Sequence, residues 1–266
     1  MRHCFLRPDL RHEREGHARR TLVRGGANRP RTPDLIAAPN RGAPVSFREK
    51  WDGIFSRPGD EPGDEDAWLE RWRGLLEADR EAPILDLGCG AGYDARTLTR
   101  WGFRVVAADF SEKALERTSR LAPKAETKNV DLTRGLPFAD SSFGAIVASL
   151  SLHYFPWQKT EEILEDARRC LTPDRHLLAR LNSTSDAHYT AAQKEEIEPN
   201  FYLVDGHPKR LFDRQSVDAL FARGWHPVGI AERTTNPYGG EKTLWEIVAR
   251  KQHRLKARPA KRAEAR

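Results

Sequence analysis

The segment 83–92 reads Pro-Ile-Leu-Asp-Leu-Gly-Cys-Gly-Ala-Gly and places one acid, Asp86, before glycines at every second position: Gly88, Gly90 and Gly92. An apolar run that breaks into such a turn before a helix-compatible stretch is typical of a nucleotide-binding strand–turn–helix unit. Glycine permits positive φ angles and lets a ligand approach the backbone closely. The N–H groups that open the next helix can then face that ligand.

The spacing of the glycines indicates which nucleotide this turn binds. Dinucleotide-binding loops have the pattern G-x-G-x-x-G beside a pyrophosphate, whereas the glycines here are one residue closer together and follow Asp86. A carboxylate repels a pyrophosphate but attracts an ammonium group. The turn therefore favours a ligand that joins an adenosine to a methionine, and it disfavours a nicotinamide dehydrogenase.

At this point the chain resembles the class I methyltransferases that depend on S-adenosylmethionine (SAM), whose first motif is acid-x-Gly-x-Gly-x-Gly after the first strand. The resemblance implies that Asp86, Gly88, Gly90 and Gly92 bind SAM as the cofactor. The alternative is that this segment is an ordinary strand-to-helix turn. The acids at the ends of the next two strands argue against that interpretation. We expect Cys89 to be a small residue packed under the turn and not a nucleophile.

Two further acids follow the next two expected strands. The strand expected at 104–108 ends in Asp109, which can accept hydrogen bonds from both ribose hydroxyls, and Phe110 joins the cofactor-binding set. The strand expected at 126–130 is followed by Asp131 and Leu132. The resemblance implies that Asp131 reaches the adenine amino group and that Leu132 packs on the ring.

The segment 136–155 resembles the L-P-F-x-D-x-S-F-D-x-I/V signature of the small-molecule branch, which includes ubiquinone, menaquinone and tellurite-resistance methyltransferases. The chain departs from the signature at Gly144, where the family has aspartate. Because that aspartate is a structural group at the start of the strand, we expect its absence to weaken the strand edge and not the ligand site. The resemblance implies a small-molecule acceptor.

Chemistry is expected where the fourth strand ends, because open α/β sheets bind ligands beyond the carboxyl ends of their strands. We expect residues 149–154 to line the methionine moiety and the acceptor, with Ser149 on the cofactor. His153 and Tyr154 are the candidate catalytic residues, His153 as a proton acceptor. The alternative is that His153 has only a structural role, capping a helix or packing in the core. A base is also not always needed, because a soft acceptor such as sulfur, selenium or tellurium can react without one.

Two aromatic regions are candidates for covering the site. The first is Lys50-Trp51-Asp52-x-x-Phe55, which resembles a segment that closes over the cofactor in relatives. In that case Trp51 would lie beside the sulfonium. The alternative is that Trp51 belongs to a helix and packs on the sheet. Residues 182–210 are expected to form the substrate cover. His188 and His207 in that region lack metal-ligand spacing, so no metal site is expected.

The pattern along residues 46–250 predicts a Rossmann-like, doubly wound α/β sheet with one antiparallel strand near the C-terminus, the class I methyltransferase fold. Helices are expected at 93–101, 111–121, 158–171 and 216–223. Residues 172–174 are expected to stop the third of these helices. Later strands are expected at 145–150, 176–181, 227–233 and 243–249, the last two joined by a hairpin at 236–240.

The charge is unevenly distributed along the 266 residues. The formal net charge is +6, but residues 1–45 carry +6 and residues 250–266 carry +7, which leaves −7 on residues 46–249. A folded body of this sign disfavours a nucleic-acid groove. We expect a disordered basic extension at 1–45, one catalytic domain at 46–250 and a basic tail at 251–266.

Residues 1–44 hold the only methionine and show no strand or helix period. We therefore expect native translation to begin near Val45. A transit peptide is the rival interpretation, but serine is scarce in this segment and acids are present.

Composition limits the remaining classes. Cys4, Cys89 and Cys170 have no paired spacing, and no apolar run is long enough for a membrane span, so we expect a cytoplasmic protein. The oligomeric state is not specified by the sequence. A non-catalytic protein that binds SAM or S-adenosylhomocysteine (SAH) remains the alternative to a methyltransferase.

Overall fold

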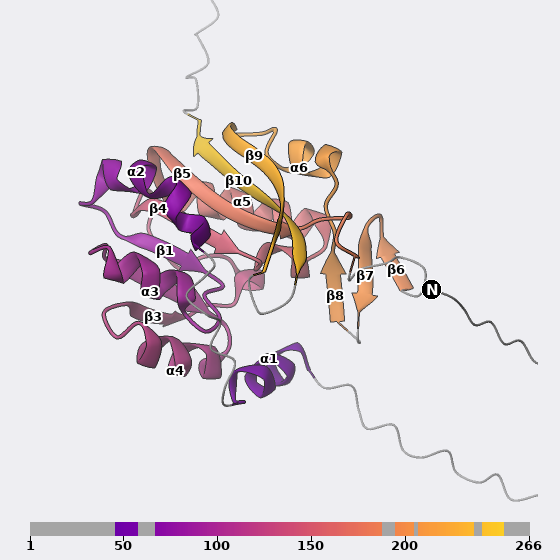
Figure 1. The fold of residues 1–266 in the computed structure, drawn as a ribbon, viewed down its shortest axis with the longest axis horizontal. Coiled ribbons are helices and arrows are strands. Elements are labelled where there is room, and N and C mark those ends of the chain that lie inside the picture. The colour runs from indigo at the N-terminus through magenta and orange to yellow at the C-terminus, as the bar shows by residue number, and fades with distance from the viewer. Residues whose placement is uncertain (1–45, 58–66, 188–194, 205–206, 237–240, 253–266) are drawn as a thin grey trace, which may run out of the picture. The chain divides into compact units, whose positions relative to one another are not determined.

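A computed structural model describes residues 46–57, 67–187, 195–204, 207–236 and 241–252 (Figure 1). The expected basic extension at 1–45 and nearly all of the expected tail lie outside the described residues, as do His188 and the central residues of the expected hairpin turn.

The central sheet has seven strands in the order β3-β2-β1-β4-β5-β10-β9. Strands β1 to β5 are parallel, and β10 runs antiparallel to both of its neighbours, β5 and β9. This confirms the predicted class I methyltransferase fold with one reversed strand. The strands are β1 (Ile84–Leu87), β2 (Val105–Asp109), β3 (Glu126–Asn129), β4 (Phe143–Ser149), β5 (Leu171–Asn182), β9 (Trp225–Thr235) and β10 (Lys242–Lys251).

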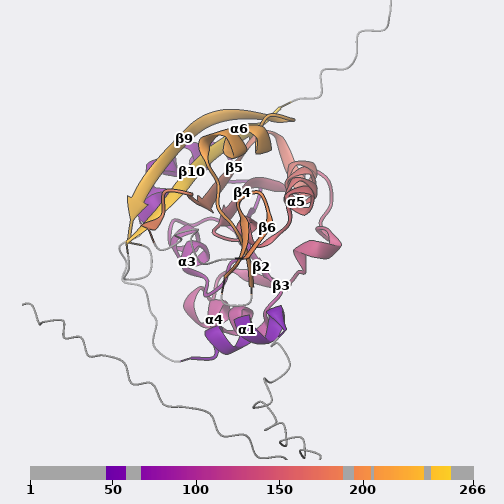
Figure 2. The same ribbon diagram turned by 90° about the vertical axis from the view of Figure 1, so that its right-hand side faces the viewer.

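Helices cover both faces of the sheet, and Figure 2 shows α3 and α5 on opposite sides of it. One face of β1 and β4 packs with α5 and α6, and the other face packs with α3 and the segment that contains Trp68. The helical elements are α1 (Phe47–Phe55), η1 (Ala67–Trp72), α2 (Arg73–Leu76), η2 (Glu77–Asp79), α3 (Tyr93–Arg100), α4 (Glu112–Leu121), η3 (Leu132–Arg134), η4 (Leu152–Tyr154), α5 (Trp157–Cys170) and α6 (Arg214–Leu220).

The central strands are apolar because helices bury them from both sides. All residues of β1 and β2 are buried, which explains their nearly continuous apolar sequence. Helix α5 buries Ile163, Leu164, Ala167 and Cys170, the periodic positions of the predicted helix. Its ends lie one residue from the predicted ones.

Helix α5 ends within one residue of the expected position, but the strand that was expected to begin at residue 176 begins at Leu171. Helix α5 ends at Cys170, and β5 begins at once because Leu171 pairs with Phe143 of β4. The next pair joins Ala145 and His176, so residues 172–175 face only Gly144. The expected stop is therefore an irregularity inside β5, and Asp174 has φ 62° there.

The cap expected at Asp213 is present, since its side chain accepts a hydrogen bond from the Ser216 N–H. Helix α6 nevertheless ends at Leu220, four residues before the expected stop at Gly224. Strands β9 and β10 form the expected antiparallel pair and are longer at both ends than predicted.

The sequence did not predict the second sheet, which has the order β6-β7-β8: β6 (Glu195–Glu198), β7 (Phe201–Val204) and β8 (His207–Arg210). Its strands are short, and β6 is mostly acidic, so no alternation marks them. Strand β8 packs against η4, which follows β4. The region expected to cover the substrate is thus an antiparallel sheet at the carboxyl edge of the main one.

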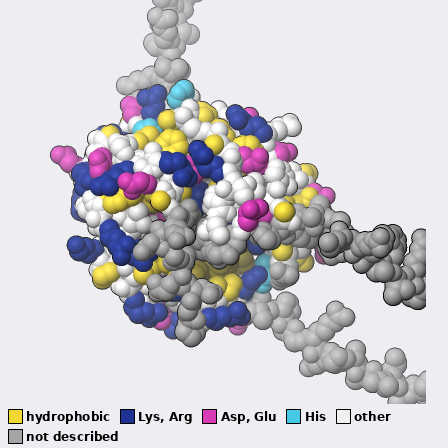
Figure 3. Space-filling model, in the orientation of Figure 1, with side chains coloured by type: hydrophobic (Ala, Val, Ile, Leu, Met, Phe, Trp, Pro, Cys, Tyr) yellow, Lys and Arg dark blue, Asp and Glu magenta, His cyan; other side chains and the backbone are white. Residues whose placement is uncertain are grey.

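The surface mixes both signs of charge. On the face seen in Figure 3, lysine and arginine side chains are interspersed with acidic ones. Within the described ranges, no helix has the length and apolar character that crossing a bilayer requires.

Candidate functional site

The glycine turn after β1 has the backbone conformation that its sequence predicts. Gly88, Gly90 and Gly92 have φ angles of 74°, 53° and 87°. A Cβ at Gly88 would lie 2.4 Å from the Cβ of Ser151, and one at Gly92 would lie 2.7 Å from the hydroxyl of Thr118. Two neighbouring elements therefore approach the turn as closely as glycine allows.

Asp86 lies directly below this turn and is 2% exposed. The N–H of Ala95, in the first turn of α3, donates to its carboxylate, while its Oδ2 atom has no hydrogen-bond partner. Burial, together with the charges of Asp94 and Asp109, holds the pKa of the Asp86 carboxyl well above its usual range. A buried acid with an unpartnered oxygen is a site for a cation, and an ammonium group satisfies both its charge and its lone pairs.

Asp109 ends β2 beside the turn and is 7% exposed. Its Oδ2 accepts from the Gly90 N–H at 2.9 Å, and its Oδ1 accepts from the Ser111 N–H at 2.9 Å. Burial raises the pKa of the Asp109 carboxyl. The N–H of Phe110 donates to the same carboxylate, which therefore keeps acceptor capacity for a ribose hydroxyl but not one free lone pair on each oxygen.

Phe110, the residue after this acid, stacks on Phe47 of α1 with ring centroids 5.5 Å apart and an angle of 10°. Its carbonyl accepts hydrogen bonds from Arg48 and Asn129. The sequence analysis did not identify Phe47 or Arg48, although both lie in the same short segment as Trp51. Helix α1 is thereby fastened to the end of β2.

Asp131 and Leu132 follow β3 at the same edge of the sheet. Asp131 caps η3 by accepting from the Thr133 N–H at 3.0 Å, and a third of its side chain is exposed. Leu132 packs against the core cluster that contains α5. Both residues lie at the predicted strand end, and Asp131 already has local partners in the N–H and hydroxyl of Thr133 and in the guanidinium of Arg134.

Helix α1 covers the glycine turn. The ring of Phe55 would lie 3.3 Å from a Cβ at Gly90, and the hydroxyl of Ser111 donates to Asp52. Trp51 stacks on Phe55 at 5.6 Å, and its Nε1 atom is buried without a partner. The predicted cover over the cofactor side is therefore a helix whose aromatic residues face the turn.

His153 and Tyr154 belong to η4, directly after β4. His153 is 2% exposed, its Nδ1 atom has no hydrogen-bond partner, and its ring lies 4.1 Å from that of Tyr154. Burial and the charges of Lys209 and Lys242 hold the pKa of the His153 imidazole well below its usual range. The imidazole is thus neutral at neutral pH, and the same environment makes it a weaker base than an ordinary histidine.

Tyr154 joins the two covers of the site. Its ring lies 5.3 Å from Trp51 and 5.6 Å from Phe47, and Phe47 lies 5.9 Å from His207 of β8. Helix α1, η4 and the small sheet therefore meet in one aromatic cluster. The structure brings Trp51 and Tyr154 together, although about 100 residues separate them in the sequence.

Ser149 at the end of β4 has a partner that the sequence analysis missed. Its hydroxyl accepts from Nε of Arg180 at 2.8 Å, and the guanidinium lies 4.6 Å above the ring of Trp68. Arg180 is buried, as is Asn182 two residues later. The signal in the sequence was the presence of these polar residues within and just after the apolar run of β5.

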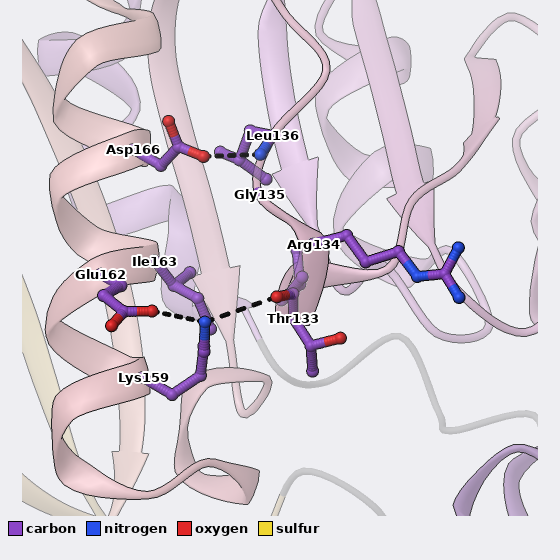
Figure 4. Close-up of a pocket in the computed structure, with 9 residues that line it drawn as sticks. Thr133, Arg134, Gly135, Leu136, Lys159, Glu162, Ile163 and Asp166 are labelled. Atoms are coloured by element: carbon purple, nitrogen blue, oxygen red, sulfur yellow. Dashed lines mark hydrogen bonds and ion pairs between the residues drawn. The ribbon is translucent and has the colours of Figure 1, made fainter.

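A cavity of about 280 Å³ lies between η3 and α5 (Figure 4). Its polar groups are paired with one another: Lys159 with Glu162 and with the Thr133 carbonyl, and Asp166 with the Leu136 N–H. The strongest chemical candidates lie instead at the glycine turn and at η4. Within the part of the chain that the structure describes, no group of three His, Cys, Asp or Glu residues could hold a metal ion.

Residues 84–174 match the protein family described as a methyltransferase domain. This range includes the glycine turn, the ends of β2 and β3, and His153.

Among curated proteins, the chain is 34% identical over 94 residues to the demethylmenaquinone methyltransferase of Thermobifida fusca, covering 34% of this chain and 40% of that protein. It is 31% identical over 148 residues to the demethylmenaquinone methyltransferase of Mycobacterium tuberculosis, covering 55% and 58%. It is also 32% identical over 116 residues to the 27-O-demethylrifamycin SV methyltransferase of Amycolatopsis mediterranei, covering 41% of each. The matched region thus spans about two fifths to three fifths of these relatives.

Solved structures agree with the fold. A SAM-dependent methyltransferase from Methanosarcina mazei superposes with a TM-score of 0.59 at 20% identity, covering 65% of this chain and 94% of that one. The N-methyltransferase NodS from Bradyrhizobium japonicum, solved in complex with SAH, superposes with a TM-score of 0.56 at 15% identity, covering 77% and 98%. At these identities the likeness concerns the fold alone.

Proposed function

We propose that this chain is a class I SAM-dependent methyltransferase, which transfers the methyl group of SAM to a small-molecule acceptor and releases SAH; residues 84–174 match a methyltransferase-domain family. The observation that carries the proposal is Asp86, a buried acid with an unpartnered oxygen under a glycine turn. A buried carboxylate of this kind is unfavourable in the free protein and becomes favourable when a cation pairs with it. The ammonium of a methionine moiety is such a cation.

The residues at the strand ends fit the rest of the cofactor. Asp109 is fixed by two backbone N–H groups and would accept from the ribose hydroxyls. Phe110 and Leu132 would contact the adenine, with Asp131 at its amino group. Trp51 would lie beside the sulfonium, which an indole face stabilises. When bound, SAM supplies an electrophilic methyl carbon.

The protein's own contribution to the reaction is alignment and exclusion of water, which in-line displacement at a methyl carbon needs most. The aromatic cluster of Trp51, Tyr154 and Phe47 closes over the strand ends and supplies the apolar wall. His153 is neutral and buried, so it could take a proton from a hydroxyl acceptor, while a soft acceptor would need none. A small-molecule acceptor is supported by the names of the demethylmenaquinone and demethylrifamycin relatives.

The proposal extends to the organisation of the chain. Residues 46–250 would form the catalytic domain between basic extensions at 1–45 and 251–266. Cys89 and Cys170, the cysteines in the part of the chain that the structure describes, are free thiols. Free thiols support a reducing compartment such as the cytoplasm.

Ligand binding tests the cofactor assignment. Titration calorimetry should show binding of SAM and SAH and none of NAD, and both adenosyl ligands should raise the melting temperature because they bind only the folded state. Binding of NAD with no response to SAM or SAH would refute the proposal.

Turnover then separates the enzyme from its alternative, a non-catalytic SAM- or SAH-binding protein. An assay coupled to SAH release, run against quinols, thiols, metalloid oxyanions and natural-product hydroxyls, should find an acceptor. Binding without turnover on this whole panel would favour the non-catalytic protein.

A further inference from the structure

Two buried ionisable residues and a serine share one face of the main sheet, where the strands otherwise carry mostly apolar side chains. Asp86 of β1 pairs in register with Val147 of β4, and Ser149 follows Val147 by two residues. Ser149 in turn pairs with Arg180 of β5. Because side chains alternate between the two faces of a strand, Asp86, Ser149 and Arg180 lie on the same face. The register of the sheet therefore brings these three side chains together at the carboxyl ends of the strands.

The packing of Trp68 agrees with this shared face. Trp68 belongs to the core cluster that contains Ile84 and Val147, and the guanidinium of Arg180 lies 4.6 Å from the centre of its ring. The Nε1 atom of Trp68 donates to Asp94 of α3 at 2.9 Å. Trp68 is 1% exposed and Arg180 is 3% exposed. The side chain of Arg180 is therefore held by a buried ring that is itself fixed to α3.

Arg180 fixes Ser149 through both its side chain and its backbone. Its Nε–H group donates to the hydroxyl oxygen of Ser149 at 2.8 Å, and its carbonyl accepts from the Leu150 N–H at 2.9 Å. Leu150 has a φ angle of 54°, so the chain turns directly after Ser149. The position of the Ser149 hydroxyl at the end of β4 is therefore set by Arg180.

The hydrogen of the Ser149 hydroxyl is available to a ligand. Its oxygen already accepts from Arg180, so the hydrogen points elsewhere, and no acceptor for it lies within the described residues. Ser149 is partly exposed, whereas Arg180 is buried. A hydroxyl that accepts from a charged donor is polarised and becomes a stronger donor itself. The Ser149 hydroxyl is therefore suited to an anionic acceptor.

The methionine moiety of SAM supplies an anion beside the ammonium assigned to Asp86, because its carboxylate and its ammonium are bonded to the same carbon. A strand spacing of about 4.8 Å and a rise of about 3.3 Å per residue put the Cα atoms of Asp86 and Ser149 about 8 Å apart. One amino-acid group can therefore contact the Asp86 carboxylate and the Ser149 hydroxyl at the same time.

Resting on the function proposed above, we propose that the Ser149 hydroxyl binds the carboxylate of the methionine moiety and that Arg180 is the positioning residue that holds Ser149 for it. Asp86 then recognises the ammonium and Ser149 the carboxylate. The site thereby selects SAM over decarboxylated SAM, which keeps the adenosine, the sulfonium and the ammonium but lacks the carboxylate.

These two ligands test the selectivity. Calorimetry should show that the wild type binds SAM at least about tenfold more tightly than decarboxylated SAM, as expected for a hydrogen bond to a charged group. Ser149→Ala should reduce this ratio of affinities about fivefold or more by weakening SAM, with the affinity for decarboxylated SAM unchanged. A ratio that Ser149→Ala leaves intact would overturn the proposal.

Ser151→Ala is the matched control. The Ser151 hydroxyl donates to the Leu87 carbonyl at 2.7 Å, so its only hydrogen is already used. The ratio should therefore stay within about twofold of the wild type. An equal loss of selectivity in Ser149→Ala and Ser151→Ala would overturn the assignment of the carboxylate to Ser149.

Arg180→Met tests the positioning role, since methionine keeps an unbranched stem and removes the donors. The ratio should fall about as far as in Ser149→Ala, and combining the two changes should lower it no further, because Arg180 acts through Ser149. Arg180→Lys keeps the charge but lacks the Nε–H group, so it should lower the ratio as well. Additive losses in the double variant would overturn the positioning role.

Arg210→Met controls for the loss of a buried arginine. Arg210 is also 3% exposed and its guanidinium lies 5.6 Å from the ring of Trp157, so its loss should lower the melting temperature and leave the ratio unchanged. If Arg180→Met and Arg180→Lys likewise lowered only the melting temperature, Arg180 would serve the fold alone and its positioning role would be overturned.

The wild type separates this proposal from the preceding one. If neither SAM nor decarboxylated SAM binds, the proposed function fails. If both bind with equal affinity, the proposed function stands and only the selection by Ser149 and Arg180 fails.

Discussion

The cofactor half and the acceptor half of the site are built in opposite ways. In the cofactor half, Asp109 is held by backbone N–H groups and the glycine turn is fixed by its own conformation. In the acceptor half, Asn182 and His153 have polar atoms with no partner in the protein. The backbone of the first half is therefore preformed by local structure, although Asp86 Oδ2 and Trp51 Nε1 in it are also unpartnered, whereas the second half has no such backbone frame.

The two halves also differ in how far apart their residues lie in the sequence. The ends of β1, β2 and β3, which form most of the cofactor half, fall within residues 86–132, one after another. The acceptor half combines η4, the end of β5 and β8, which extend over residues 152–210. The difference suggests that cofactor binding is robust to changes in the cover, whereas acceptor choice depends on it.

The largest effect is expected at the glycine turn, where the cofactor half depends on backbone alone. Gly92→Ala forces a side chain into a φ of 87° and to within 2.9 Å of the Thr118 backbone. We expect a loss of about 2–5 kcal/mol in the free energy of unfolding and no measurable SAM binding. Chemical denaturation and calorimetry measure both.

Gly74→Ala in α2 is the matched control, because no atom lies within 4 Å of the added Cβ. It should be neutral or stabilising by up to about 1 kcal/mol. If both alanine variants behaved alike, the turn would not be the constrained element described here.

Asp109→Ala should have the next largest effect. It removes the acceptor for the ribose hydroxyls and leaves the N–H groups of Gly90 and Ser111 without theirs. We expect SAM affinity to fall tenfold or more and the free energy of unfolding to fall by about 1–3 kcal/mol. Asp218→Ala, in an exposed ion pair with Arg214, serves as the control. Unchanged SAM affinity would mean that β2 does not end at the ribose.

Asp86→Asn should weaken SAM binding and stabilise the ligand-free protein. The raised pKa of Asp86 means that its stabilising contribution is complete below the ordinary carboxyl value of 3.8 and is lost as pH rises through the folded-state pKa. Asparagine does not ionise, so the variant does not lose this stability. Its melting temperature without ligand should therefore be higher than that of the wild type at pH 8, and the difference in melting temperature should become smaller toward acid pH.

The same change removes the charge that pairs with an ammonium, so SAM affinity should drop about tenfold or more. A variant that melts lower than the wild type at pH 8 would contradict the assignment of Asp86 as a buried acid strained in the absence of a cation.

His153→Ala should have the smallest effect on turnover. A soft acceptor such as a thiolate needs no base to remove a proton, so we expect a loss below about tenfold, compared with 100-fold or more for a general base. SAH affinity should not change. A loss of 100-fold or more with a thiolate acceptor would make His153 the catalytic base.

The variant also has a pH signature in stability. Because its folded-state pKa is lowered, His153 contributes stability that is complete above the ordinary histidine value of 6.5 and is lost as pH falls from there through the folded-state pKa. His153→Ala should therefore flatten the decline in melting temperature below about pH 6.5.

Local patterns predicted most of the main sheet because its central strands β1, β2 and β4 are buried apolar runs and helices such as α5 have a periodic buried face. Asp86, Asp109 and Asp131 were found because each follows such a run at a turn. The small sheet of β6 to β8 was missed because its strands are short and β6 is acidic, and the start of β5 was expected at residue 176 instead of 171 because the local pattern does not show that Leu171 pairs with Phe143 as soon as α5 ends.

By itself the sequence determined the order of strands and helices, the glycine turn and the acids beside it, because these depend on neighbours along the chain. Only the tertiary structure decided that Asn182 and His153 are buried without partners, that Lys209 and Lys242 act on one imidazole, and that Trp51 meets Tyr154. The burial of a side chain and the charges around it depend on elements that are distant in the sequence, so no local sequence pattern can predict them.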